Sequence, residues 1–425
     1  MNILLCPLSD GGYLYPAIAA GLELRRRGHV ISALGRIRAA AVLAEAGLPF
    51  VPAQDLGVRT GFSAARWWGT GMEQYRATLR AAVLTQADML LTSVLCHGAL
   101  TAAEVLDIPV VVIGLSVHLW DYQAGGSGEP QGKTRENRTR DMAAHYAALR
   151  EQAGLRPRRY PQAQDPLLGA ALLLRGAPEL EYPGALLPGR VHHAGPLAWE
   201  PAADPAEIDE LRQHLDRNGK PVVYVHLGRF FEGINQWPVL NAAFTSGPFQ
   251  AVIERGRSRD PRPAPGADVL LVHKPWMGPL IDRAGLVLSS GTSSPVLASL
   301  LRGRPLAVSP NGAEQPLLAA ACLRAGVAVR VPRTVTGDPA ALLRSAWRDR
   351  GLHGHARYLG RKLAAVDSAA HAADVVEQVT SSADPAGKID TPPALGKLTV
   401  LGRQRNSGRQ GNEQHRRQHN ADACT

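Results

Sequence analysis

Short apolar runs alternate with segments of helical character along almost the whole chain, and this pattern constrains the fold most. The first run, NILLCPL at 2–8, ends at a turn and precedes PAIAAGLELRRRG at 16–28. In that segment Pro16 suits a first helical turn and Gly28 a helix end. Uninterrupted apolar runs of this length are typical of strands buried on both faces of a parallel sheet. A strand at 29–35, a helix at 37–47 and a strand in LPFVPA follow, so the chain opens as a βαβαβ unit.

The alternation continues in two series separated by PAADPAEIDE at 201–210, which reads as a linker entering a helix. Further strands are predicted at 87–94, 108–115, 167–178, 191–199, 221–228, 249–255, 268–273, 285–290 and 305–309. Further helices are predicted near 98–106, 137–153, 294–302, 313–325 and 338–349. We therefore expect an α/β protein with two Rossmann-like domains, 1–200 and 201–380, that face each other across a cleft. Residues 381–425 are rich in Gly, Gln, Asn and Arg, and we expect a disordered basic tail there.

Composition sets outer bounds on the function. The chain has 425 residues, 45% of them hydrophobic, which is enough for a large core. Its formal charge is +10, which suits a polyanionic small ligand such as a nucleotide, although a generally basic surface explains the charge equally well. The four cysteines, Cys6, Cys96, Cys322 and Cys424, form no CxxC pair. We expect reduced thiols and no metal site.

Targeting and membrane signals are not evident in the sequence. The first residues carry no basic leader, and no apolar run reaches the length of a membrane span. The sequence therefore favours a cytoplasmic protein. Dinucleotide binding is disfavoured, because SDGGYLYP after the first strand is not G-x-G-x-x-G and no acidic residue ends the second strand.

Several stretches resemble, in order, family 1 glycosyltransferases of the GT-B fold, above all bacterial enzymes that glycosylate natural products. NILLCPLSDGGYLYPAIAAGLELRRRGHVISALG is similar to that family's first strand, G-H-x-x-P loop, helix and R-G-H-x-V turn. VVYVHLGR resembles its V-x-x-S-x-G-S segment. HKPWMGPLIDRAGLVLSSGTSSPVLASLLRGRPLAVSPNGAEQ resembles the donor signature, from W-x-P-Q through H-G-G-x-G-T to G-x-D-Q. The resemblance covers nearly all of residues 1–380.

This resemblance implies an inverting, metal-independent transfer of a hexose or deoxyhexose. The sugar would pass from a UDP or TDP carrier to a hydrophobic acceptor. The nucleotide sugar is a co-substrate, and no further cofactor, nucleic acid or membrane span is implied. The acceptor would bind to the N-terminal domain and the donor to the C-terminal domain. The oligomeric state, the sugar and the acceptor stay open.

The expected site for the nucleotide sugar consists of residues whose chemistry suits a departing diphosphate and a sugar. Small residues before a helix expose N–H groups and a helix dipole to growing negative charge. Glu and Gln supply acceptors and donors for sugar hydroxyls. A tryptophan can stack on the base, although Trp276 as a core residue is an equal alternative. The expected donor-binding residues are Gly228, Arg229, Trp276, Ser290, Gly291, Thr292, Ser293, Glu314 and Gln315.

The catalytic base is the main departure from the resemblance. Counting back from Pro16, the family's histidine position holds Tyr13, and its aspartate partner falls at about Ser93. Tyrosine, with an ordinary pKa near 10, is a poor base at pH 7. Asp10, His97 and His118 are the substitutes at the presumed ligand edge, and an already nucleophilic acceptor is the other solution. Acceptor contacts are expected at Gly12, Trp67, His118 and Trp120.

Three other functions compete with this one. The missing histidine and aspartate also suit a non-catalytic homologue that binds a glycosylated molecule or partners an active transferase. A sugar-nucleotide 2-epimerase shares the two-domain fold but needs acidic and basic groups around C2, of which no clear set is present. Nucleic-acid binding through the tail is the least supported of the three functions, since no aromatic residues are interleaved with the basic residues of the tail.

Overall fold

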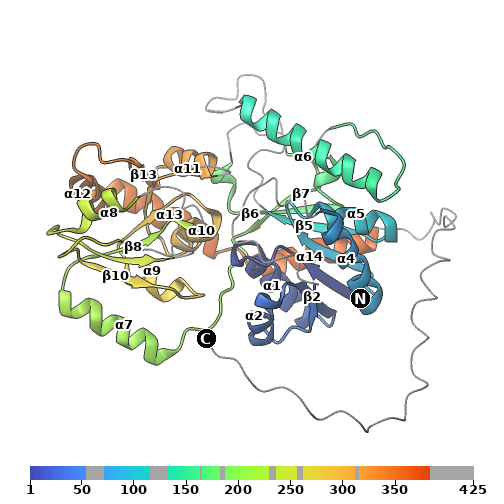
Figure 1. The fold of residues 1–425 in the computed structure, drawn as a ribbon, viewed down its shortest axis with the longest axis horizontal. Helices are drawn as coiled ribbons and strands as arrows, with labels where there is room; N and C mark the ends of the chain where they lie inside the picture. Colours follow the sequence, from blue (N-terminus) through green and yellow to red (C-terminus); the bar gives the residue numbers. More distant parts are fainter. Residues whose placement is uncertain are drawn as a thin grey trace, which may run out of the picture. The chain divides into compact units, whose positions relative to one another are not determined.

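The structure, a computed structural model, describes residues 1–53, 71–114, 132–162, 165–181, 187–228, 236–255, 262–311 and 315–382. Residues Met1–Ser382 form one compact unit. It contains two sheets whose strands all pair in parallel, one from each of the two predicted series (Figure 1). The predicted α/β class is confirmed.

The first sheet has the strand order β3-β2-β1-β4-β5-β6-β7. Its strands are β1 (Asn2–Cys6), β2 (Val30–Gly35), β3 (Phe50–Pro52), β4 (Met89–Ser93), β5 (Val110–Gly114), β6 (Ala171–Arg175) and β7 (Val191–Gly195). The order reverses between β1 and β4, and such a switch point opens a crevice at the carboxyl ends of the strands. The segments after β1 and β4 therefore lie where a doubly wound sheet binds ligands.

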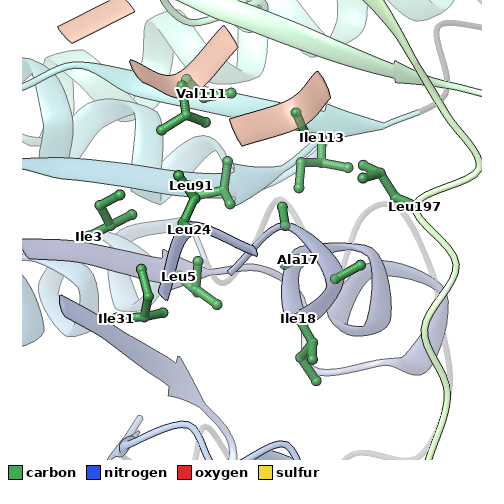
Figure 2. Close-up of a cluster of buried hydrophobic side chains, with 14 of the residues drawn as sticks. Ile3, Leu5, Ala17, Ile18, Leu24, Ile31, Leu91, Val111, Ile113 and Leu197 are labelled. Carbon is green, nitrogen blue, oxygen red and sulfur yellow. The ribbon is translucent and has the colours of Figure 1, made fainter. Parts of the chain in front are cut away.

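Helices cover both faces of this sheet. Side chains that alternate along the strands pack on one face against α1 (Gly11–Arg26) and α2 (Ala40–Glu45), and on the other against α4 (Gly71–Thr85), α5 (His97–Leu106) and α6 (Gly132–Gln152). Figure 2 shows the first of these clusters, in which Ala17 and Ile18 of α1 lie beside strand residues such as Leu5. Burial of both faces explains the uninterrupted apolar runs.

The second sheet has the order β10-β9-β8-β11-β12-β13, with its switch point between β8 and β11. Its strands are β8 (Val222–His226), β9 (Gln250–Glu254), β10 (Val269–Val272), β11 (Leu286–Ser289), β12 (Leu306–Val308) and β13 (Ala328–Arg330). Its helices are α7 (Pro205–Asn218), α8 (Trp237–Phe244), α9 (Gly278–Arg283), α10 (Ser293–Leu301), α11 (Gln315–Arg324), α12 (Pro339–Arg348) and α13 (Arg350–Ala364). The segments after β8 and β11 flank this second crevice.

The last described helix, α14 (Ser368–Ser382), packs in the core of the first sheet although it follows the second series. Its Ala372 and Val376 are fully buried there. Arg27, at the end of α1, fixes it further through ion pairs with Asp374 and Glu377 at 2.7 and 2.8 Å. The chain thus returns to its first sheet before residue 383.

Helix α1 begins five residues earlier than predicted. It starts at Gly11, so Pro16 lies inside it and not in its first turn. A proline has no N–H, and the Gly12 carbonyl therefore has no donor at the i+4 position. Arg175 supplies the missing donor, with Nη1 3.2 Å from the Gly12 oxygen. Tertiary context, invisible in the local sequence, lets the helix pass through the proline.

Several helices were not predicted, namely α4, α8, α9, α13 and α14. Helix α4 places Val83 and Leu84 at exposed positions, so its apolar pattern is a poor guide. The cysteine prediction is confirmed for Cys6, Cys96 and Cys322, which are free and buried; Cys424 lies outside the described residues. Among the described helices, none has the length and apolar character to cross a bilayer.

Candidate functional site

The carboxyl edge of the second sheet gathers polar side chains from four segments. His226 ends β8, Ser290 follows β11, Ser309 follows β12, and Gln315 begins α11. Five polar atoms of this edge are buried without a hydrogen-bond partner in the described part of the protein: His226 Nδ1, Ser290 Oγ, Thr292 Oγ1, Ser309 Oγ and Gln315 Nε2. Buried polar groups are nearly always paired, so such a group of atoms calls for a ligand or ordered water.

Two glycines shape this edge. Gly228 has φ +66°, and a Cβ there would lie 3.5 Å from Thr292 and 3.6 Å from Ser290 Oγ. Gly291 has φ +84°, and a Cβ there would lie 2.9 Å from the Gln315 carbonyl oxygen. Both positions have a left-handed backbone, which favours glycine, and at Gly291 there is also no room for a Cβ atom. The segments after β8 and β11 and the start of α11 are therefore close together.

Helix α10 begins directly after Gly291. Its N-cap, Thr292, makes no side-chain capping bond, and its first turn holds no acidic residue. The first N–H groups of a helix have no intrahelical partner and carry partial positive charge. Together with the Ser290 and Thr292 hydroxyls, this terminus can stabilise a phosphate group.

The Gln315 amide is oriented by the backbone. Its Oε1 accepts a hydrogen bond from the Asn311 N–H at 2.9 Å, and its side chain is fully buried. This bond assigns the oxygen, so Nε2 is the free end and can donate to a ligand oxygen. The sugar-binding role of Gln315 stays a prediction. Glu314 and Arg229 lie outside the described residues.

His226 belongs to this edge and was not predicted. It ends β8 and pairs in register with Glu254 of β9 and Ser289 of β11. Its backbone carbonyl accepts a hydrogen bond from the Ser290 N–H at 3.4 Å. Burial lowers the pKa of its imidazole, while the Glu254 carboxylate opposes that shift. The available signal was a histidine as the last residue of the strand VVYVH.

Trp276 occupies the core and not the crevice. Its side chain is 2% exposed and packs in the apolar cluster beneath the second sheet, with Lys274 Nζ 5.8 Å from its ring centroid. A ring in that position offers no face to a nucleotide base. Of the two roles considered for Trp276, the structure favours the core residue.

At the first sheet, Asp10 caps α1 from the end of the β1 segment. Its side chain makes no capping bond, and Oδ1 lies 3.2 Å from Arg38 Nη2. Tyr13 lies in the first turn of α1, half-buried against the cluster of α4 and α5. Ser93 is buried and accepts a hydrogen bond from the Leu8 N–H at 3.1 Å, so it positions the loop that precedes Asp10.

Arg175, at the carboxyl end of β6, was not predicted. It is 8% exposed, and its guanidinium donates to the carbonyls of Gly12 at 3.2 Å and Pro196 at 3.1 Å. Within the described residues it has no carboxylate partner. Burial lowers its pKa to about 10, and interaction with Tyr13 partly opposes the shift. Buried cations are usually paired with an acid, so this one is exceptional.

His97 begins α5 and is 2% exposed. Its Nδ1 lies 3.1 Å from His145 Nδ1, and its buried Nε2 has no partner in the described part of the chain. Burial, and secondarily His145, lowers its pKa to about 3. A side chain this buried presents neither ring nitrogen to an acceptor, so His97 is a poor candidate for the base.

The pH dependence of the free energy of unfolding should show that folded His97 stays neutral. Below the ordinary histidine pKa of about 6.5, the unfolded chain binds a proton that folded His97 refuses, so the free energy of unfolding falls by about 1.4 kcal/mol per pH unit down to about pH 3. His97→Phe should lower that slope by one proton in denaturant titrations between pH 6 and 4. His145→Phe should keep most of it, because burial is the larger cause. An unchanged slope in His97→Phe would contradict this assignment.

The remaining predicted acceptor residues, Trp67, His118 and Trp120, lie outside the described residues. Gly12 is described, and a Cβ on it would lie 3.4 Å from Ser294 Oγ. The first turn of α1 and the first turn of α10 are thus neighbours. No group of three or more potential metal ligands occurs among the described side chains.

Known structures that resemble the chain identify its fold. No protein-family model and no curated protein sequence matches the chain. The solved glycotransferase of kitacinnamycin resembles it with a TM-score of 0.69 and 22% identity, over 89% of this chain and 98% of that one. The calicheamicin glycosyltransferase has a TM-score of 0.65 and 20% identity, over 90% of this chain and 99% of that one. The spinosyn rhamnosyltransferase complexed with thymidine diphosphate has a TM-score of 0.63 and 19% identity, over 89% of this chain and 100% of that one. The chain has the GT-B fold of antibiotic glycosyltransferases, as its sequence predicted.

Proposed function

We propose that this protein is an inverting glycosyltransferase. It moves a hexose or deoxyhexose from UDP or TDP to a hydrophobic natural-product acceptor, and the step uses no metal ion or further cofactor. One observation carries the proposal: the buried, unpartnered Ser290 Oγ, Thr292 Oγ1 and Gln315 Nε2 gather at the switch point of the second sheet. The GT-B fold, and the thymidine diphosphate in the structure of one similar protein, support it.

The chemistry of this edge suits departure of a nucleoside diphosphate. Negative charge grows on the leaving diphosphate in the transition state, and donors fixed in advance stabilise it without reorganisation. The Ser290 and Thr292 hydroxyls and the uncapped first turn of α10 are such donors. Gln315 Nε2 donates to an oxygen of the transferred sugar.

Asp10 acts as the base that takes the acceptor's proton. It lies at the start of α1, close to the position where the resemblance expects a base, and Arg38 fixes its Oδ1. Its carboxylate receives the proton. Tyr13 then contributes to the shape of the acceptor site, and Ser93 holds the loop that precedes Asp10 through its hydrogen bond with the Leu8 N–H.

Exchange of one atom tests the role of Gln315. Gln315→Glu keeps an oxygen for the Asn311 N–H and replaces the donor Nε2 by an oxygen that cannot donate. Loss of a buried hydrogen bond of this kind costs about 1–3 kcal/mol, so the KM of the sugar donor should rise about fivefold to somewhat over a hundredfold. Steady-state kinetics measure it, with the exposed Gln213→Glu in α7 as the matched control. Equal KM values for the wild type and Gln315→Glu would remove Gln315 from the site.

Turnover decides between the enzyme and a non-catalytic homologue. The absence of histidine and aspartate at 13 and 93, together with buried His97, favours that second candidate. The wild-type protein is incubated with a panel of UDP- and TDP-sugars and aromatic or macrolide acceptors, and products are identified by mass spectrometry. A glycosylated acceptor of inverted anomeric configuration is the expected result. Tight nucleotide binding with neither transfer nor hydrolysis would identify a binding protein.

A further inference from the structure

The N-terminus of α1, which follows a strand of the first sheet, lies next to the N-terminus of α10, which follows a strand of the second sheet, and the buried Arg175 contacts the first of them. Gly12 in the first turn of α1 lies next to Ser294 in the first turn of α10, where a Cβ on Gly12 would come within 3.4 Å of Ser294 Oγ. Neither terminus has a side-chain cap, and neither first turn contains an acidic residue. Each terminus carries partial positive charge.

Arg175 adds a full charge to the same place. Its Nη1 donates to the Gly12 carbonyl, and burial to 8% exposure removes most of its solvent screening. Asp10, the N-cap of α1, has its Oδ1 bonded to Arg38, and no ion pair joins Arg175 to a carboxylate among the described residues. A buried cation beside a positive helix end, bonded to carbonyls but paired with no described carboxylate, is unfavourable unless an anion binds there.

Unpartnered hydroxyls indicate where that anion binds. Ser290 is 2% exposed and its Oγ has no partner in the described part of the protein, and Thr292 Oγ1 is likewise unpaired. Both lie immediately before α10, between Gly228 and the first turn that faces Gly12. Hydroxyls, helix N–H groups and a guanidinium are the donors that phosphate oxygens select.

We propose that Arg175 and the Gly11–Gly12 turn of α1 form the second half of a diphosphate site, facing the Ser290–Ser294 half. This inference rests on the proposed function, since the anion is taken to be the diphosphate of the sugar donor. The first sheet then binds the donor as well as the acceptor. Loss of the diphosphate and deprotonation of the acceptor by Asp10 take place at the same helix end.

The test compares diphosphates with nucleosides. Isothermal titration of the full chain uses inorganic pyrophosphate, UDP, TDP, uridine and thymidine as probes. Arg175→Gln keeps a donor for the Pro196 carbonyl, where Nε now lies, but removes the charge and the donor to Gly12. It should weaken pyrophosphate, UDP and TDP about tenfold or more while nucleoside affinity is unchanged. Arg175→Lys keeps the charge and should stay within about threefold of the wild type. Arg190→Gln, at an exposed arginine before β7, is the matched control.

A second variant is independent of the arginine's packing. Gly12→Ala places a methyl group at ordinary contact distance from Ser294 Oγ, so the protein should fold, and the methyl group should weaken diphosphate binding by filling the gap between the helix ends. Thermal unfolding verifies that each variant is folded.

The outcomes separate this inference from the proposed function. Equal pyrophosphate, UDP and TDP affinities in wild type, Arg175→Gln and Gly12→Ala would overturn the inference and leave the donor site of the second sheet standing. Loss of nucleoside affinity together with diphosphate affinity would also overturn it, because the effect would then be structural. Pyrophosphate binding that depends on Arg175, without UDP or TDP binding, would support the anion site and refute the nucleotide-sugar function.

Discussion

Asp10→Asn is expected to lower kcat by about two orders of magnitude, the usual contribution of a positioned general base. The amide keeps the size of the side chain and an oxygen for the contact with Arg38, but it cannot take a proton from the acceptor. Donor affinity should not fall, because asparagine keeps the size of the side chain and removes only a negative charge beside the proposed diphosphate site. The measurement is a rate at saturating donor with any sugar that the wild type transfers.

Two controls make that result specific. Asp209→Asn, in an exposed ion pair on α7, should leave kcat unchanged. Arg38→Met keeps the Asp10 carboxylate and should reduce kcat far less than Asp10→Asn. Full activity in Asp10→Asn would mean that the acceptor arrives already nucleophilic, or that a residue outside the described part of the chain is the base.

Gly98→Ala should cause the largest loss of stability of any single methyl addition in this account. A Cβ on Gly98 would lie 2.5 Å from the Tyr75 amide nitrogen and 2.6 Å from the Gly71 carbonyl oxygen. Both atoms belong to the backbone of α4, which cannot shift without separating from α5. Overpacking of a fixed contact costs about 1–3 kcal/mol and occasionally more, so we expect a loss of about 3 kcal/mol in the free energy of unfolding by urea titration.

Gly354→Ala is the matched control. Gly354 also lies inside a helix, α13, but a Cβ there has no neighbour within 4 Å. Alanine has the higher helix propensity, so this variant should gain up to about 1 kcal/mol. Similar effects of the two substitutions would show that the α4–α5 contact is looser than described.

Local patterns in the sequence predict the two sheets well but not every helix. Strands such as 2–8 and 221–228 are buried on both faces, so their apolar runs are unmistakable. Helix α1 was misplaced because its start depends on Arg175, which is distant in sequence and replaces the hydrogen bond that Pro16 lacks. Helix α14 was missed, and its return to the first sheet is a tertiary choice that no local pattern encodes.

The candidate site divides in the same way. The sequence singles out Ser290, Gly291, Thr292 and Gln315, because a glycine and small polar residues at a helix start have a local meaning. The structure brings them to one edge of the second sheet, and their role in donor binding stays a prediction. The burial of Trp276 and His97 could not be predicted, since exposure depends on which elements pack over a side chain. Arg175 and His226 carried no motif, and they are noticed only when the burial and partners of each polar group are examined.

The proposed function depends on whether the carboxyl edge of the second sheet binds a nucleoside diphosphate. Hydrogen–deuterium exchange of the full chain with and without saturating UDP or TDP measures this binding at the edge itself. We expect slower exchange for the amides of 290–296, at the start of α10, and around Gln315, with little change in α4 or α13. No saturable protection with either nucleotide, or protection confined to other segments, would show that the edge does not bind a nucleoside diphosphate.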